Sequence, residues 1–281
     1  MIVGVPPALL HAGVQFEWDR FTVHPSTIIG LAALGALHAW AASRASVKPS
    51  TTRRALFWTG LVTIFLSLNG PIHDLSDSYL FSAHMTQHLV LTLIAPPLLL
   101  AGVTADMLRP ALRNRGVSAL ARRVTPAPAA FVIFNLVLLA WHLPVLYNAA
   151  MRSHEVHIIQ HLMFMAASVI MWWPIMSPLP ELPRLPYPGQ MLYAFLMTLP
   201  MGMVSIFITY ADTLLYPAYA SAPRVLGLSP LEDQRLGGLI MWIPGGFFFL
   251  GVLSVAFFRW ARDAEAAESV HRSSLIGIEH R

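Results

Sequence analysis

The chain contains long runs without a formal charge, and these runs decide what kind of fold it can adopt. Residues 78–104 contain no Lys, Arg, Asp or Glu, and neither do residues 56–69. Over the whole chain 11% of residues are charged and 56% are hydrophobic, whereas a soluble domain carries about 25% charged residues. Because so little charge is available for a surface in water, we expect lipid to cover much of the folded chain.

Seven apolar stretches have the length and the polar flanks of membrane helices. A helix needs about 20 mostly apolar residues to cross the hydrocarbon core of a bilayer. The predicted spans are residues 25–43, 55–69, 81–102, 128–147, 156–175, 190–210 and 236–258. The sequence therefore predicts an all-α, polytopic membrane helix bundle of about seven transmembrane helices. We expect a single transmembrane domain over residues 1–260, with its core at 81–260, and a cytoplasmic tail at 261–281.

The positions of Lys and Arg predict the orientation, because cytoplasmic loops carry the excess of positive charge. Fourteen of the 18 basic residues fall in the tail and in the loops after the first, third and fifth spans, and the other four fall on the opposite side. This asymmetry predicts an N-terminus outside and a C-terminus in the cytoplasm. We interpret the net charge of +4 as loop charge, so nucleic acid is not an expected partner.

Histidines gather on one predicted side of the membrane. Nine of the 12 fall at the outer ends of the predicted spans or in outer segments. Ionisable side chains inside a membrane are costly and usually face the bundle interior or a water-filled cavity. The histidines within the spans are therefore candidates for function. The outer set is His11, His24, His73, His84, His88, His142, His154, His157 and His161.

Two spans share one histidine pattern. His84-Met-Thr-Gln-His88 opens the third span, His157-Ile-Ile-Gln-His161 opens the fifth, and each is followed by Leu. Residues four apart lie on one helix face, roughly 6 Å apart, so each pair can hold a metal ion from a single helix. We predict one metal site at the outer end of the bundle, made by both pairs and His142. The supporting candidates are His154, His73, Asp233, Gln87, Gln160 and Met85.

Three interpretations of this cluster stay open. Imidazole suits copper, zinc, iron and nickel, and soft thioethers favour cuprous copper. Thioethers are available from Met85 and, at predicted outer depths, from Met201, Met203 and Met241. Two facing histidines could instead ligate haem iron axially. The third interpretation is structural polar packing of His, Gln, Asp and Trp side chains. The chain has no cysteine, which excludes a thiolate site.

Acidic residues occur on the same predicted side. Asp74, Asp77, Asp212 and Glu155 fall in predicted outer loops. Each of them either orients a histidine by accepting its ring N–H or is a solvated loop charge. Asp233 stands where the seventh span begins, so we expect its side chain to point towards the other outer helix ends.

The chain resembles the CtaG family of cytochrome c oxidase assembly factors in a series of motifs whose order and spacing are together specific. The resemblance extends over roughly residues 81–260. It implies a multi-pass protein of the bacterial inner membrane that takes part in maturing a haem–copper oxidase, with copper delivery or insertion as the expected role. The motifs are His84-Met-Thr-Gln-His88 with residues 95–102, Trp141-His-Leu-Pro144 with Tyr147, His157-x-x-Gln-His161, Trp172-Trp-Pro174 with Pro178, Leu215-Tyr-Pro217 with Tyr219, and residues 228–234 running into 237–242.

The favoured function is an assembly factor that holds copper at the outer membrane face and passes it to an oxidase subunit, with periplasmic copper chaperones as further expected partners. A copper transporter would need a polar route, and the inner halves of the spans offer little beyond His38 and Asn135. A haem-binding electron carrier is a further alternative. An enzyme is not expected, because no nucleophile motif, phosphate loop or other catalytic signature accompanies the histidines.

Overall fold

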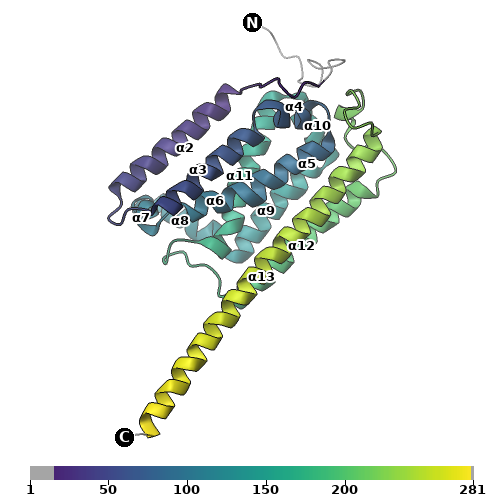
Figure 1. Ribbon diagram of the computed structural model, residues 1–281. Coiled ribbons are helices and arrows are strands. Elements are labelled where there is room, and N and C mark those ends of the chain that lie inside the picture. The colour runs from purple at the N-terminus through teal and green to yellow at the C-terminus, as the bar shows by residue number, and fades with distance from the viewer. Residues whose placement is uncertain (1–15, 280–281) are drawn as a thin grey trace.

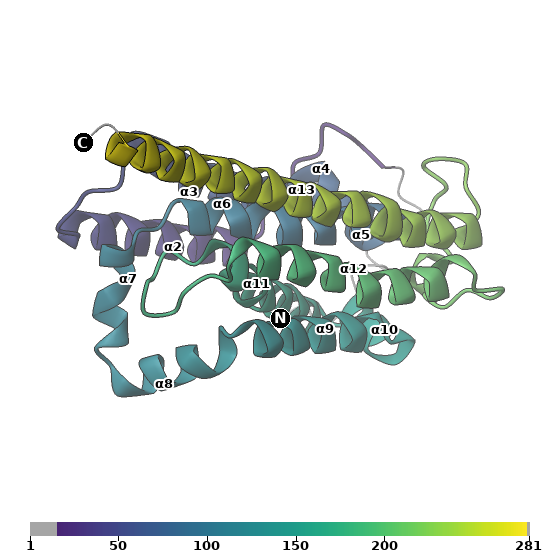
Figure 2. The same cartoon turned by 90° about the horizontal axis from the view of Figure 1, so that it is seen from below.

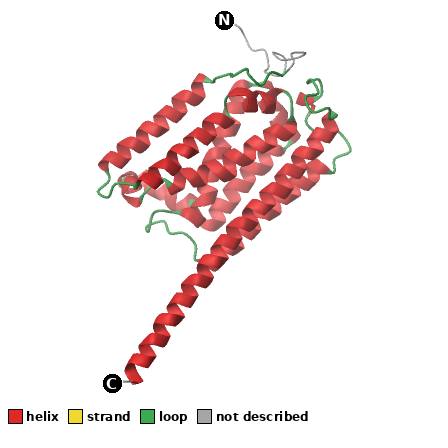
Figure 3. Ribbon diagram, viewed as in Figure 1, coloured by secondary structure: helices red, strands yellow, loops and turns green. Residues whose placement is uncertain are grey.

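The computed structural model describes residues 16–279, with side chains as far as residue 268. His11, His280 and the side chain of His271 fall outside the described residues. Within this part of the chain every regular element is a helix (Figure 3). The elements are α2 Pro25–Arg44, α3 Thr51–Ser67, α4 Gly70–Ser78, α5 Phe81–Leu89, the π-helical turn η1 Val90–Ile94, α6 Ala95–Ala101, α7 Ala105–Leu112, α8 Arg115–Val124, α9 Ala127–His142, α10 Pro144–Arg152, α11 His154–Met176, α12 Tyr187–Thr209, the short 3-10 helix η2 Pro217–Tyr219 and α13 Pro230–Glu279.

The longer helices run side by side, with α2 along one flank of the bundle and α13 along the other (Figure 1). Five stretches are long and apolar enough to cross a membrane: α2, the α5–α6 segment, α11, α12 and the apolar part of α13. Two bent helix pairs, α3 with α4 and α8 with α9, bring the number to seven if each pair forms one span. Large apolar side chains such as Ile29, Leu136 and Phe247 are exposed on these helices, as lipid-facing positions require. The predicted all-α membrane bundle is confirmed.

Several predicted boundaries were wrong. The fourth span ends at His142, where Leu143 is extended and α10 begins at Pro144. Proline disfavours helical geometry in the residue before it, which explains the break. The segment after the second span, expected to be a loop, is the helix α4, bent by 48° from α3. The predicted tail continues α13 as far as Glu279.

The third span is interrupted where its prolines begin. α5 passes through the π-helical turn η1 before Pro96 and Pro97 enter the first turn of α6. Neither proline has an N–H, so the carbonyl of Thr92 finds no donor four or five residues ahead. The indole Nε1 of Trp172 on α11 donates to that oxygen at 2.9 Å. This bond ties α11 to the helix that carries His84 and His88.

The helix α13 approaches both α5 and α12 closely because two glycines stand at the contact. A Cβ added at Gly237 would overlap the Phe81 ring, and one at Gly238 would lie 3.0 Å from the carbonyl oxygen of Ser205. Small residues allow such approaches between membrane helices. The α5 helix therefore lies inside the bundle, packed by α4 and α13, while α11 packs against its continuation in η1 and α6; His84 is fully buried.

The two ends of the bundle differ. Helices α4 and α10 cap one end, which we call the α4–α10 end, and α7 and α8 lie at the other (Figure 1). Seen from below, α7 and α8 extend away from the packed helices (Figure 2). His84 and His157 stand in the first turns of α5 and α11, which begin at the α4–α10 end, and His88 and His161 follow one turn deeper.

Candidate metal centre

The helix α11 starts immediately before its histidines. The hydroxyl oxygen of Ser153 accepts the N–H of Val156 at 3.3 Å, and Glu155 lies in the first turn. A hydroxyl at this position satisfies a free N–H, and an acidic residue in the first turn favours the helix dipole. His157 and His161 follow one turn apart on the buried face.

The helix α5 is capped by a residue 151 positions away. The carboxylate of Asp233 accepts the backbone N–H of Phe81 at 2.7 Å and both the N–H and the hydroxyl of Ser82, at 3.2 and 2.5 Å. Asp233 is held in place by a capping box at the start of α13, in which Ser229 and Glu232 exchange hydrogen bonds. The side chain of Asp233 thus points towards another helix end, as expected. Its hydrogen bonds go to Phe81 and Ser82 rather than to a histidine, so its role is to position α5.

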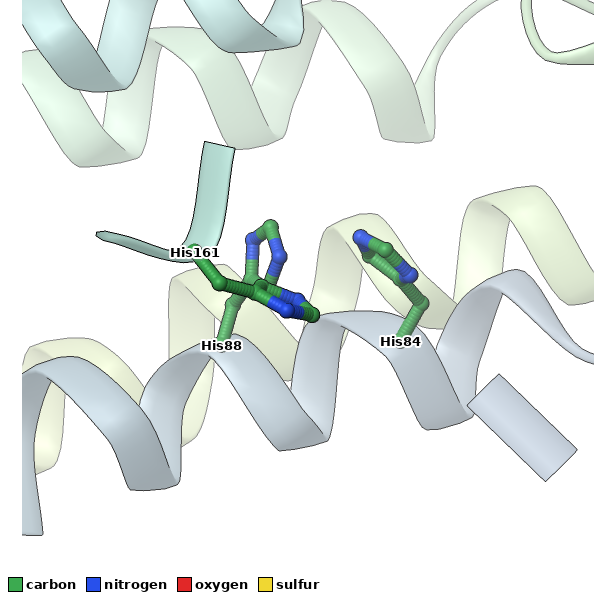
Figure 4. Close-up of side chains that lie close together, drawn as sticks. All are labelled: His84, His88 and His161. Atoms are coloured by element: carbon green, nitrogen blue, oxygen red, sulfur yellow. The ribbon is translucent and has the colours of Figure 1, made fainter. Parts of the chain in front are cut away.

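The four histidines of the two patterns lie together in the bundle interior, and Figure 4 shows three of them, His84 and His88 from α5 and His161 from α11. Ring centroids are 4.2 Å apart for His84 and His88 and 4.3 Å apart for His157 and His161. Across the two helices, His84 lies 5.5 Å from His157, and His88 lies 5.5 Å from His161. The ligand atoms of His84, His88 and His161 all lie within 4.8 Å of one another.

Asp77 on α4 joins this cluster. Its Oδ2 lies 3.3 Å from Nδ1 of His157 and 3.3 Å from Nε2 of His73. A ligand atom of Asp77 is also within 4.8 Å of those of His84 and His157. Sequence reasoning left Asp77 between a histidine partner and a solvated charge, and the structure shows the partner. Asp77 follows His73 by four residues, the same spacing as in the histidine pairs. This spacing indicates a shared face only on a helix, and the sequence predicted a loop here, whereas the structure has the helix α4.

The remaining supporting candidates take different positions. Gln87 donates to the carbonyl of Ser67 at 2.6 Å and lies 3.0 Å from Nδ1 of His73. Gln160 is fully buried, and neither polar atom of its side chain has a partner. His154 is exposed, with its ring 5.9 Å from that of His24. Met85 is fully buried and packs against α13 near Gly237.

Aromatic residues border the cluster. The ring of Tyr147 stands 5.3 Å from that of His84, and its hydroxyl lies 2.8 Å from that of Tyr219. The hydroxyl of Tyr219 also donates to the carbonyl of Ser76 on α4, and that of Tyr216 donates to the carbonyl of His142, each at 2.8 Å. These bonds tie the segment before α13 to α4, α9 and α10. Tyr147, Tyr216 and Tyr219, which belong to separate sequence motifs, therefore lie together beside the histidines.

Unpartnered ring nitrogens distinguish this cluster from ordinary polar packing. Buried polar atoms almost always have a hydrogen-bond partner. Here several buried imidazole nitrogens have none, and a neutral imidazole offers one lone pair to a metal ion. A donor set of imidazoles with one carboxylate suits a transition-metal ion, and imidazole binds copper, zinc, iron and nickel. The unpartnered atoms are Nδ1 and Nε2 of both His84 and His88, and Nε2 of His142, His157 and His161.

The fold and the cluster define a multi-pass membrane protein with a buried histidine and carboxylate centre near one end of its helices. A sequence model of the cytochrome c oxidase caa3 assembly factor family, Caa3_CtaG, matches residues 33–263. The protein therefore belongs to this family of oxidase assembly factors. The family is one of assembly factors rather than enzymes, which agrees with the expectation from sequence.

Two similar proteins come from mycobacteria. An uncharacterized protein of Mycobacterium bovis and one of Mycobacterium tuberculosis are each 26% identical to this chain over 276 residues. The alignment covers 92% of this chain and 41% of each relative, so the chain spans less than half the length of these proteins. No solved structure matches the chain.

Proposed function

We propose that the protein assists the maturation of a haem–copper oxidase in the bacterial inner membrane by holding copper in the histidine cluster and passing it to an oxidase subunit. The family supports the part in oxidase assembly. The observation that carries the copper part is the set of buried ring nitrogens without partners beside Asp77. In this proposal periplasmic copper chaperones supply the ion, and lipid surrounds the bundle.

The charge of Asp77 suits a bound cation. An unpaired cation inside a membrane is costly, and one nearby carboxylate offsets that cost. The same carboxylate accepts the Nδ1–H of His157, which leaves the Nε2 lone pair of that ring free. A carboxylate that fixes a histidine in this way is common next to bound metals. Asp77 therefore contributes both charge balance and orientation.

Holding copper at one end of the bundle fits better than transport across it. For a polar route through the inner halves of the spans, the sequence offered little beyond His38 and Asn135. His38 lies 3.2 Å from the carbonyl of Gly102, and Asn135 donates to the carbonyl of Phe131 at 2.8 Å. Both side chains thus contact backbone carbonyls nearby and do not form a continuous polar route. Haem, the other alternative, would be visible in the absorption spectrum of the purified protein.

The test combines metal analysis with complementation. We expect a deletion strain to lose assembled haem–copper oxidase activity at limiting copper while other respiratory complexes persist, and the wild-type gene to restore it. The double variants His84→Ala/His88→Ala and His157→Ala/His161→Ala should fail to restore oxidase, because each removes one helix's pair of ligands. Both should also bind less copper per purified protein than the wild type.

The control is His38→Ala, which removes a buried histidine outside the cluster. It should keep the copper content and restore the oxidase. Unchanged copper in both double variants, with membrane insertion verified, would refute the site. Normal oxidase in the deletion strain at limiting copper would refute the role in assembly.

A further inference from the structure

A small cavity lies one turn deeper along α5 than His84. Its volume is about 20 Å³, enough for a single water-sized occupant. The side chains of two histidines and three methionines line it, together with leucine and phenylalanine side chains and Thr92. The histidines are His88 and His142, and the methionines are Met85, Met201 and Met241.

The protonation of His142 follows from its neighbour. Its Nδ1 lies 2.7 Å from the carbonyl oxygen of Leu138. A carbonyl oxygen only accepts, so Nδ1 carries the hydrogen and Nε2 carries the lone pair. That Nε2 is buried without a partner in a side chain that is 6% exposed. Histidines that bind metals usually donate their other N–H to a carbonyl or carboxylate in this way.

The three methionines that line the cavity come from different helices. Met85 lies on α5, Met201 on α12 and Met241 on α13, and all three are buried. A Cβ added at Gly245 would lie 3.1 Å from the sulfur of Met201, so the glycine leaves room for the thioether. Thioethers are soft ligands that select monovalent copper. Among the described residues, no carboxylate lines the cavity. The position between His84 and His157 differs in this respect, because the Asp77 carboxylate borders it.

We propose that this cavity is a second metal site, selective for a soft monovalent cation, in which His142, His88 and thioether sulfur are the ligands. It is distinct from the position bordered by Asp77, His84 and His157. The inference rests on the proposed function only in taking Cu(I) as the natural ion. Binding of a soft cation by this donor set stands on the cavity itself.

His88 lines the cavity, and one of its ring nitrogens also lies within 4.8 Å of a ring nitrogen of His84, which borders the Asp77 position. Both of its ring nitrogens are buried without partners, and a neutral imidazole has one lone pair to give. It can therefore serve one position at a time. An ion that leaves the Asp77 position for the cavity would exchange oxygen and nitrogen ligands for sulfur and nitrogen ligands, with His88 as the shared residue.

The experiment loads the purified full-length protein with Cu(I) under reducing, anaerobic conditions and records X-ray absorption at the copper edge. Sulfur scatterers are expected for the wild type. They should disappear in Met201→Leu/Met241→Leu/Met85→Leu, in which leucine keeps the volume and removes the sulfur. The same triple variant should bind fewer equivalents of Ag(I), a soft cation, than the wild type. The matched control is Met203→Leu, an exposed methionine on the same helix as Met201.

Disruption of the other position separates the two proposals. Asp77→Asn/His157→Ala should lose copper from the Asp77 position and retain the sulfur signal. Copper with only nitrogen and oxygen scatterers in the wild type would overturn the cavity site and leave the proposed function intact, with a water bridging His88 and His142 as the occupant. Sulfur scattering that persists in the triple variant would also overturn it.

Discussion

At the scale of single residues, oxygen atoms that can only accept hydrogen bonds decide which ring nitrogen of a histidine carries the hydrogen. The other ring nitrogen then keeps its lone pair. The carboxylate of Asp77 holds Nδ1 of His157, and the Leu138 carbonyl holds Nδ1 of His142. In both rings Nε2 is then the nitrogen that faces no partner. Two histidines from different helices are thus prepared in the same tautomer, one for each of the two proposed positions.

This argument gives a prediction for Asp77→Asn. The amide keeps the shape but loses the charge, and its NH2 group can donate to Nδ1 of His157, which favours the opposite tautomer. We expect copper affinity to fall by about 10- to 100-fold, the range found when partners of metal ligands are changed. Competition against a chelator of known affinity measures it. Asp74→Asn, which changes a carboxylate on α4 bonded to Thr22, should have no effect, and equal affinities in both variants would show that Asp77 has no part in binding.

At the scale of elements, the starts of two helices set the depth of the histidines. α11 begins with its own cap, Ser153, whereas α5 depends on Asp233 from α13. A carboxylate buried at a helix start gains from hydrogen bonds and from the helix dipole. The hydrogen bond from Trp172 to the Thr92 carbonyl then fixes α5 against α11. The two histidine pairs meet because these contacts hold their helices in register.

We therefore expect Asp233→Ala to destabilise the protein by about 1.5–3 kcal/mol, since it removes hydrogen bonds to a charged group from buried donors. Thermal unfolding in detergent measures the change. Asp212→Ala alters an exposed carboxylate in the loop before α13, and it should stay within about 0.5 kcal/mol of the wild type. An Asp233→Ala protein as stable as the control would mean that the cap contributes nothing to the position of α5.

At the scale of the whole molecule, charge and histidines separate to opposite ends. The basic segment between α2 and α3 and the basic helix α8 lie away from the α4–α10 end (Figure 1). Excess positive charge belongs on the cytoplasmic side. The histidine cluster would then lie near the outer face, where a periplasmic source of copper can reach it.

This orientation is a prediction that reporter fusions can test. Fusions in the segment 44–54 and in the segment 109–123 should report a cytoplasmic location, and fusions in the segment 211–228 should report the opposite side. Finding either basic segment outside would reverse the topology and place the cluster near the cytoplasm.

The sequence by itself determined the membrane class, the helical fold and the pairing of histidines on single helix faces. These properties are local: the length of an apolar run, its flanking charge and a four-residue spacing are all read within one segment. The break after His142 lies inside a continuous apolar run, and Pro144 is its local cause, because proline disfavours helical geometry in the residue before it.

Only the tertiary structure decided which acidic residue meets the histidines. The sequence favoured Asp233 as the supporting carboxylate and left Asp77 open, yet Asp77 contacts His157 and Asp233 caps α5. Likewise, Met201 and Met241 come to line one cavity with His142 because α12 packs against both α9 and α13. Such contacts join residues far apart in the chain. They depend on how each helix is rotated and how deep it lies in the bundle. Close packing at Gly237 and Gly238 sets this rotation and depth, and no single segment of the sequence encodes it.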